Sequence, residues 1–104
     1  MTDAERAFLS ETAIGRVSTI GPDGFPHSTP VRLQLDGTAV QFETDGSSVK
    51  LRHIRQNPRI AILVDGERKR GVLLKGSAQI VRDAQGKDQA VVRLDPDRVI
   101  SWRL

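Results

Sequence analysis

The sequence predicts a mainly β protein, a small antiparallel barrel or sandwich with about six strands and two short helices. Short apolar or alternating segments recur along the chain, and turn signals such as Gly21-Pro22-Asp23-Gly24 and Asp36-Gly37 separate them. Only two stretches have helical spacing, and closing such a sheet into a barrel would remove its exposed edges. The length of 104 residues predicts a single domain spanning residues 1–104.

The N-terminal half is predicted to hold one helix and three strands. Thr2 and Glu5 have the spacing of a capping box, which predicts a helix over residues 3–10. The strands are expected at 15–20, 26–35 and 39–44. Pro30 falls inside the second strand and has no N–H, so we expect an edge or a bulge there.

The C-terminal half begins with a predicted helix over residues 48–56, in which Leu51 and Ile54 face the core. The nearly all-apolar segment 59–64 predicts a central strand, and segment 65–69 a loop. The next strand, 70–81, is long, and Gly76 predicts a bend at a barrel corner.

The last predicted strand is either 90–94 or 98–104, because Asp95-Pro96-Asp97 separates two candidate runs. Trp102, in the second run, is expected in the core or at a subunit interface, with stacking on a cofactor as the other possibility.

Small hydroxyl and basic residues gather where the second helix begins: Ser47, Ser48, Lys50 and Arg52. A helix start presents unpaired N–H groups and partial positive charge, so it attracts anions and disfavours cations. Lys50 in the first turn is therefore explained if an anion, which we take to be a phosphate, lies there. The alternative is a solvated helix face with serine caps.

Bulk composition narrows the class of protein. Net charge is +3, with 16 Lys and Arg against 13 Asp and Glu, and the signs are mixed. Phosphorylated small molecules and nucleic acid both suit such a surface. Cysteine is absent, so oligomerisation is the expected source of extra burial for so small a chain. We expect no metal site, since the two histidines lack ligand spacing, and we expect the cytoplasm.

The chain resembles the pyridoxamine 5′-phosphate oxidase-like, FMN-binding split barrels. The resemblance rests on five segments in the order of the family: IGRVSTIGPDGFPHSTPVR, DGTAVQFET, SxKxRxIRxNPRIAxLVD, RGVLLKGSAQIV and RVISW. It implies a six-stranded antiparallel split β-barrel with two short helices. Within this family, the chain is similar above all to a short branch described as binding the deazaflavin coenzyme F-420.

This resemblance implies an FMN- or deazaflavin-dependent oxidoreductase that is a homodimer with its cofactor at the interface. FMN is the first expectation and coenzyme F-420 the alternative. The phosphate would be held by Ser48, Lys50 and Arg52, with Ser47 beside them. The ring and ribityl chain would run along Ser28, Thr29, Val31, Arg32 and Thr44. No catalytic side chain is expected, because the cofactor carries the hydride chemistry.

The sequence departs from true pyridoxamine-phosphate oxidases at Thr29 and Val49, where those enzymes carry arginine. Oxidation of pyridoxamine phosphate itself is therefore not expected. Two other functions stay open. One is a cofactor-binding or storage protein without turnover. The other is a small basic barrel that binds single-stranded nucleic acid, although the chain has only three Phe, one Trp and no Tyr for stacking.

Overall fold

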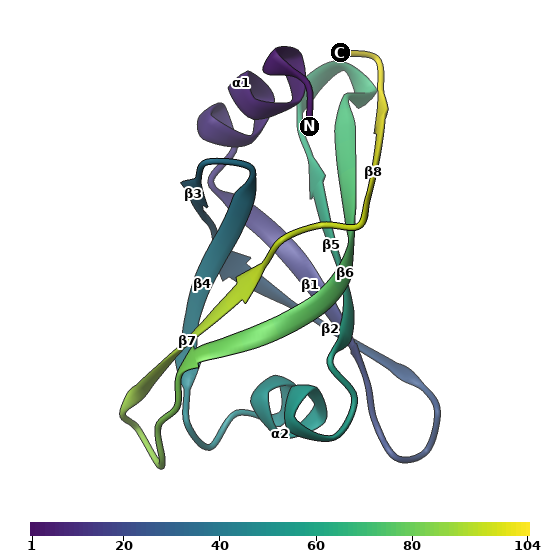
Figure 1. The fold of residues 1–104 in the computed structure, drawn as a ribbon. Coiled ribbons are helices and arrows are strands. Elements are labelled where there is room, and N and C mark those ends of the chain that lie inside the picture. The colour runs from purple at the N-terminus through teal and green to yellow at the C-terminus, as the bar shows by residue number, and fades with distance from the viewer.

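The computed structural model describes all residues from Met1 to Leu104 and consists of an open antiparallel barrel with a helix at each end (Figure 1). The strands follow the order β2-β1-β5-β6-β7-β4-β3 in an eight-stranded sheet, with β8 paired to β6 off this path. The elements are α1 (Asp3–Glu11), β1 (Ile14–Ile20), β2 (Pro26–Arg32), β3 (Gln34–Asp36), β4 (Ala39–Asp45), α2 (Val49–Gln56), β5 (Arg59–Asp65), η1 (Glu67–Lys69), β6 (Gly71–Arg82), β7 (Gln89–Leu94) and β8 (Arg98–Trp102). The mainly β split-barrel class is confirmed, with eight strands instead of six.

The long strand β6 explains one of the two extra strands. Its first half pairs with β5 on one side and β8 on the other, while its second half pairs with β7. The runs 90–94 and 98–104 were predicted as alternatives, yet both form strands because β6 offers each a different segment. Gly76 lies between these segments, and a Cβ there would approach Asp97 N to 3.1 Å.

The second extra strand arises because the predicted strand 26–35 divides at Leu33. The Leu33 N–H donates to the Ala13 carbonyl (2.6 Å), outside the β1–β2 ladder, and its side chain is buried. The chain then turns from pairing with β1 to pairing with β4. As predicted, Pro30 lies on an edge strand, since β2 pairs with β1 alone.

The barrel encloses one continuous core of 18 buried residues, to which almost every element contributes. The α1 helix begins with the predicted capping box: the Glu5 N–H donates to Thr2 Oγ1 (3.1 Å) and the Thr2 N–H to Glu5 Oε1 (2.7 Å). At the opposite end of the molecule lies α2, which buries Leu51 and Ile54 as predicted (Figure 1). No helix in the chain has the length and apolar character needed to cross a membrane.

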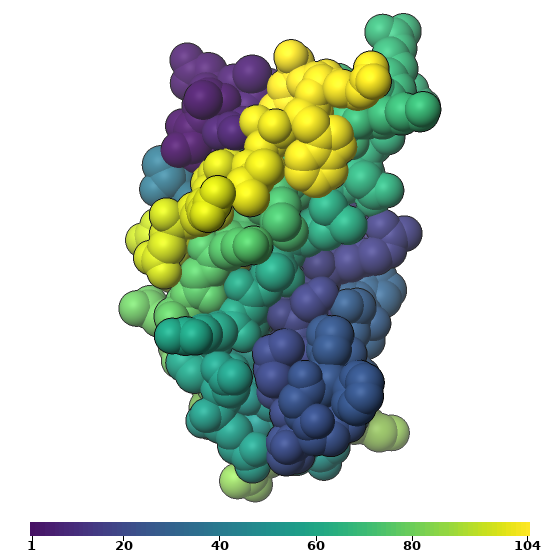
Figure 2. All heavy atoms as spheres, turned by 90° about the vertical axis from the view of Figure 1, so that its right-hand side faces the viewer, coloured from purple at the N-terminus to yellow at the C-terminus, as the bar shows by residue number.

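A second apolar surface lies outside the barrel, on the face of β5, β6 and β8 that points away from the core. Leu63, Leu73 and Ile100 are half-buried neighbours in the strand register, whereas Ile62 and Leu74, which alternate with them, are fully buried. Figure 2 views this side of the molecule, where the C-terminal strand crosses its upper part. Trp102 lies here, 38% exposed, so of the predicted positions the core is excluded, and the subunit interface and cofactor stacking stay predictions.

Candidate functional site

The start of α2 is organised by two hydroxyl groups. Ser48 is the N-cap, and its Oγ accepts the Leu51 N–H at 3.2 Å. The Thr44 hydroxyl, from the end of β4, donates to the same oxygen at 2.9 Å. The N–H groups of Val49 and Lys50 have no intrahelical partner at this position of a helix. Two donors and the positive end of the helix dipole therefore remain for a ligand.

Lys50 places a second positive charge at this helix end. Its Nζ lies 3.4 Å from Thr44 Oγ1, and none of the four ion pairs of the protein includes it. Burial lowers the pKa of Lys50, and the neighbouring charge of Asp45 opposes this shift only in part. The Asp45 carboxylate accepts a hydrogen bond from Gln89 Nε2. An ammonium group without a carboxylate partner, at a helix start, is electrostatically suited to hold an anion.

The residues predicted along β2 fall on its two sides, because side chains alternate in a strand. Ser28 and Arg32 are exposed on the outer side, where Ser28 Oγ lies 2.7 Å from Ser18 Oγ on β1. Thr29 and Val31 point inward, and Val31 is 7% exposed. Thr29 Oγ1 is buried without a hydrogen-bond partner, as is Nδ1 of His27, its neighbour on the same side. An edge strand with orphaned polar atoms fits a polar ligand better than a closed core.

The predicted site residues form one connected group and several separate ones. Thr44, Ser48 and Lys50 are joined by hydrogen bonds. Arg32 lines a small hollow of about 90 Å³ with Gln34 and Glu43, which brings β2 and β4 to one place.

Ser47 and Arg52 lie outside the connected group. Both are exposed, and the Ser47 N–H is not free because it donates to the Gly86 carbonyl (3.0 Å). No hydrogen bond joins the β2 residues to the start of α2, so the structure connects two of the predicted phosphate residues, Ser48 and Lys50, with Thr44 from the predicted ring and ribityl wall.

The structure also shows a contact between α2 and β1 that sequence reasoning did not find. His53 on α2 is buried, with Nδ1 2.9 Å from Thr19 Oγ1 on β1 and its ring edge-on to His27. A Cβ on Gly21 would lie 2.8 Å from His53 Nε2, so this glycine makes room for the imidazole. The contact seats α2 against the end of β1. A histidine and a glycine 32 positions apart carry no signal of such a contact in the sequence.

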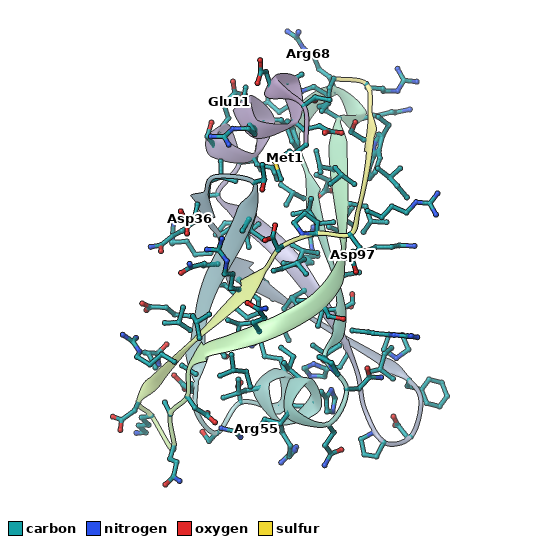
Figure 3. The ribbon with its side chains drawn as sticks, viewed as in Figure 1. Met1, Glu11, Asp36, Arg55, Arg68 and Asp97 are labelled. Atoms are coloured by element: carbon teal, nitrogen blue, oxygen red, sulfur yellow. The ribbon has the colours of Figure 1, made fainter.

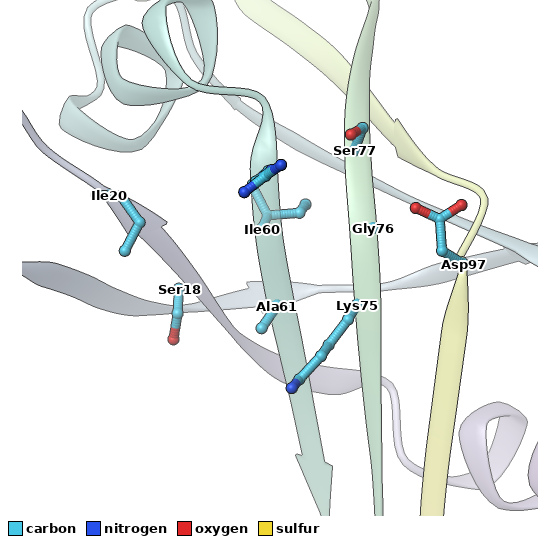
Figure 4. A pocket seen from close by; sticks show the side chains of 9 residues that line it. Ser18, Ile20, Ile60, Ala61, Lys75, Gly76, Ser77 and Asp97 are labelled. Atoms are coloured by element: carbon cyan, nitrogen blue, oxygen red, sulfur yellow. The ribbon is translucent and has the colours of Figure 1, made fainter.

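The outer face of the sheet contains a hollow of about 360 Å³ over β1, β5 and β6. Figure 4 shows its residues, with Ser18 and Ile20 on β1, Ala61 on β5, the Lys75 side chain running from β6 towards β5, and Asp97 beyond β6. The backbone floor at Gly76 leaves this surface shallow and open. It adjoins the apolar row of Leu63, Leu73 and Ile100 and lies on the side of β2 that carries Ser28 and Arg32.

The fold defines a class of proteins, the split barrels, and in this chain two free amides and Lys50 lie together at the start of α2. The family model described as Pyridoxamine 5′-phosphate oxidase matches residues 1–102. The chain therefore belongs to the pyridoxamine 5′-phosphate oxidase family.

Comparison with known proteins finds relatives in sequence and in fold. A 5a,11a-dehydrotetracycline/5a,11a-dehydrooxytetracycline reductase of Streptomyces rimosus subsp. rimosus is 28% identical over 117 residues, which cover 97% of this chain and 82% of that protein. A conserved hypothetical protein from Mycobacterium tuberculosis has a TM-score of 0.83 at 28% identity, covering 98% of this chain and 84% of that one. An F420 reductase shares the fold, with a TM-score of 0.84 at 19% identity and coverage of 96% and 98%.

Proposed function

We propose that the protein is an oxidoreductase that binds FMN, or in its place the deazaflavin coenzyme F-420, and transfers hydride to or from a small molecule. The observation that carries the proposal is Lys50: a partly buried ammonium that belongs to no ion pair, beside two hydroxyl groups at the start of α2. A reductase relative at 28% identity supports reduction of a small organic molecule as the direction to test first.

In this proposal the phosphate binds the N–H groups of Val49 and Lys50, the Lys50 ammonium and the Ser48 hydroxyl. Arg52 approaches from solvent, and Ser47 contributes its side chain only, because its N–H is already bonded. The ribityl chain and ring lie along β2, where the orphaned Thr29 hydroxyl gains a partner. When bound, the flavin or deazaflavin supplies the hydride chemistry, and these residues supply binding and orientation.

We further propose that the protein acts as a homodimer through the outer face of β5, β6 and β8. Leu63, Leu73 and Ile100 form an apolar row there, and exposed apolar surface of this kind marks association sites. A second copy on this face would also cover the outer side of β1 and β2, including Ser28 and Arg32. Because β2 is an edge strand, a cofactor along its free edge would contact Thr29 on the inner side and the second subunit on the outer side.

The nucleic-acid alternative finds little support in the distribution of aromatic residues. Phe8 and Phe42 are buried in the core. The exposed aromatic side chains are Phe25, in the β1–β2 turn, and Trp102, in β8 at the opposite end of the molecule (Figure 1). Two aromatic residues so placed do not form a continuous stacking platform.

The test is a binding titration followed by turnover. The purified protein is mixed with FMN or with coenzyme F-420, and changes in visible absorbance and cofactor fluorescence are recorded. Binding of one of them, followed by substrate-dependent oxidation of its reduced form, supports the proposal. Binding without turnover on a panel that includes dehydrotetracyclines would indicate the storage alternative. Binding of neither cofactor would overturn the assignment, and salt-dependent capture of an oligonucleotide would then favour the nucleic-acid alternative.

A further inference from the structure

The turn between β6 and β7, residues 83–88, lies directly against the segment that leads into α2. Gly46 is buried at this contact, and a Cβ at that position would lie 2.4 Å from the carbonyl carbon and oxygen of Ala84 and 2.5 Å from Gln85 Cα. All three are backbone atoms, so no side-chain rotation could relieve the clash. Glycine at position 46 is therefore required by a backbone-to-backbone approach.

Two hydrogen bonds fix the turn and the segment in one arrangement. The Gly46 N–H donates to the Asp88 carbonyl (2.8 Å), and the Ser47 N–H donates to the Gly86 carbonyl (3.0 Å). These residues immediately precede the N-cap Ser48, whose oxygen receives the Thr44 and Leu51 bonds. The position of the turn thus sets the direction in which the chain enters α2.

A third contact comes from the helix itself. Arg55 donates to Asp83 Oδ1 (2.6 Å) and to the Ala84 carbonyl (3.1 Å). Figure 3 shows Arg55 on α2 at the end of the molecule that also holds the β6–β7 turn. Hydrogen bonds from Arg55 and the Ala84 amide lower the pKa of Asp83. The side chains of Arg55 and Asp83 are 38% and 58% exposed, so the share of this ion pair in stability is small and the Gly46 approach is the stronger constraint.

We propose that the β6–β7 turn is a clamp on the anion-binding segment, and that Gly46 is a positioning residue for the phosphate of the ligand. This inference rests on the proposed function, because it assumes that a phosphate binds at the start of α2. Gly46 itself donates no bond to the ligand. It acts by letting the turn approach, which holds Ser47, Ser48 and the free amides of Val49 and Lys50 in a fixed orientation.

The test uses the full chain with Gly46→Ala, and Gly37→Ala as the matched control. Gly37 has φ +63° with nothing within 4 Å of a Cβ, so its substitution strains a remote hairpin without crowding anything. The probes are FMN and riboflavin, which differ by the phosphate, together with coenzyme F-420 and its phosphate-free deazariboflavin. Amide hydrogen exchange of residues 46 and 47 in the free protein reports on the clamp without any cofactor.

We expect Gly46→Ala to speed exchange at Ser47 and to weaken binding of the phosphorylated cofactor by about tenfold. A tenfold loss corresponds to one hydrogen bond between the phosphate and an amide of Val49 or Lys50 that is no longer well oriented. Binding of its phosphate-free counterpart should change little, and Gly37→Ala should behave as wild type in both measurements. Should Gly46→Ala fail to fold, Asp83→Ala replaces it. That change removes the hydrogen bond from Arg55 and the acceptor of the Ala84 N–H. We expect it to weaken binding of the phosphorylated cofactor by less than Gly46→Ala does.

Unchanged exchange at Ser47 would refute the clamp. Equal losses for phosphorylated and phosphate-free ligands would show a general structural defect and would also refute the positioning role. A wild-type protein that binds neither phosphorylated compound overturns the proposed function, and with it the positioning role. Exchange at Ser47 still shows in that case whether the turn holds the segment, so the two failures can be told apart.

Discussion

Lys50 Nζ lies 3.4 Å from the hydroxyl oxygen of Thr44, and this neutral group is the hydrogen-bond partner of its ammonium. Partial burial lowers the pKa of Lys50, the charge of Asp45 opposes this shift only in part, and no ion pair includes the ammonium. The protein therefore carries a partly buried positive charge, and a bound anion would offset the free-energy cost of burying it.

Replacing Lys50 should lower the affinity for the cofactor without lowering the free energy of unfolding. We expect Lys50→Met to weaken binding of FMN or coenzyme F-420 by about tenfold or more, since a charge-assisted hydrogen bond is lost. Without ligand, the variant should be as stable as wild type at pH 7 or more so, because the uncompensated charge is gone. Titration calorimetry and urea unfolding measure the two effects. A marked loss of stability without loss of affinity would contradict the assigned role.

The lowered pKa of Lys50 also predicts how stability depends on pH. Because the folded pKa lies below the ordinary value of 10.5, the unfolded chain binds more protons between the two values. The penalty for burying the charge is therefore fully present below the folded pKa and disappears as pH rises to the ordinary value. Urea unfolding on the alkaline side of neutrality should show a relative gain for wild type that Lys50→Met lacks. Parallel curves for the two proteins would contradict this.

Glu5 should contribute stability that also rises with pH, but in the acidic range, because its folded pKa too lies below the ordinary value. Its pKa is lowered by the hydrogen bond from the Thr2 backbone first, and then by Ser101. We expect Glu5→Gln to cost about 1 kcal/mol at pH 7, the value typical of a helix cap. The difference should be complete above the ordinary value of 4.5 and vanish as pH falls through the lowered pKa of Glu5, where both side chains are neutral. Urea unfolding at several pH values tests this, and a difference that stayed constant with pH would exclude the carboxylate as its source.

The proposed subunit interface predicts a charge-dependent loss of the dimer. Leu63 is half-buried on the outer face beside Leu73, so Leu63→Glu can reach water in a single subunit but would be buried and unpaired between two. We expect this variant to be a folded monomer in analytical ultracentrifugation. Val81→Glu is the control, because Val81 is 51% exposed on the half of β6 that pairs with β7. A wild-type monomer, or a dimer that survives the change, would contradict the proposed interface.

Trp102 offers a spectroscopic probe of the same face. It pairs with Gly71, and a Cβ on Gly71 would lie 2.2 Å from Cζ2 of the indole. We expect Gly71→Ala to displace the ring towards water and to shift tryptophan emission to longer wavelength. The signal is unambiguous because the protein has one tryptophan. Gly37→Ala again serves as the control, and an unchanged emission maximum in Gly71→Ala would show that the indole does not rest on this glycine.

Local patterns in the sequence determined the elements and part of the site. Val40, Phe42 and Thr44 alternate along the predicted strand 39–44 and lie on one buried face of β4, because a strand turns successive side chains to opposite sides. The Thr2–Glu5 capping box and the serine at the start of α2 were also found correctly. These interactions join residues only a few positions apart, so the spacing carries them.

Only the tertiary structure decided which distant segments meet. The runs 90–94 and 98–104, predicted as alternatives, both form strands because β6 is long enough to pair with β7 and β8 along different segments. Thr19 meets His53, and Gly46 meets Ala84, across separations that no periodicity encodes. The sequence by itself determined the fold class, the helix start and its excess of positive charge. The closure of the barrel decided where that charge lies, how far it is desolvated and which turn holds it, because burial is a property of the packed chain.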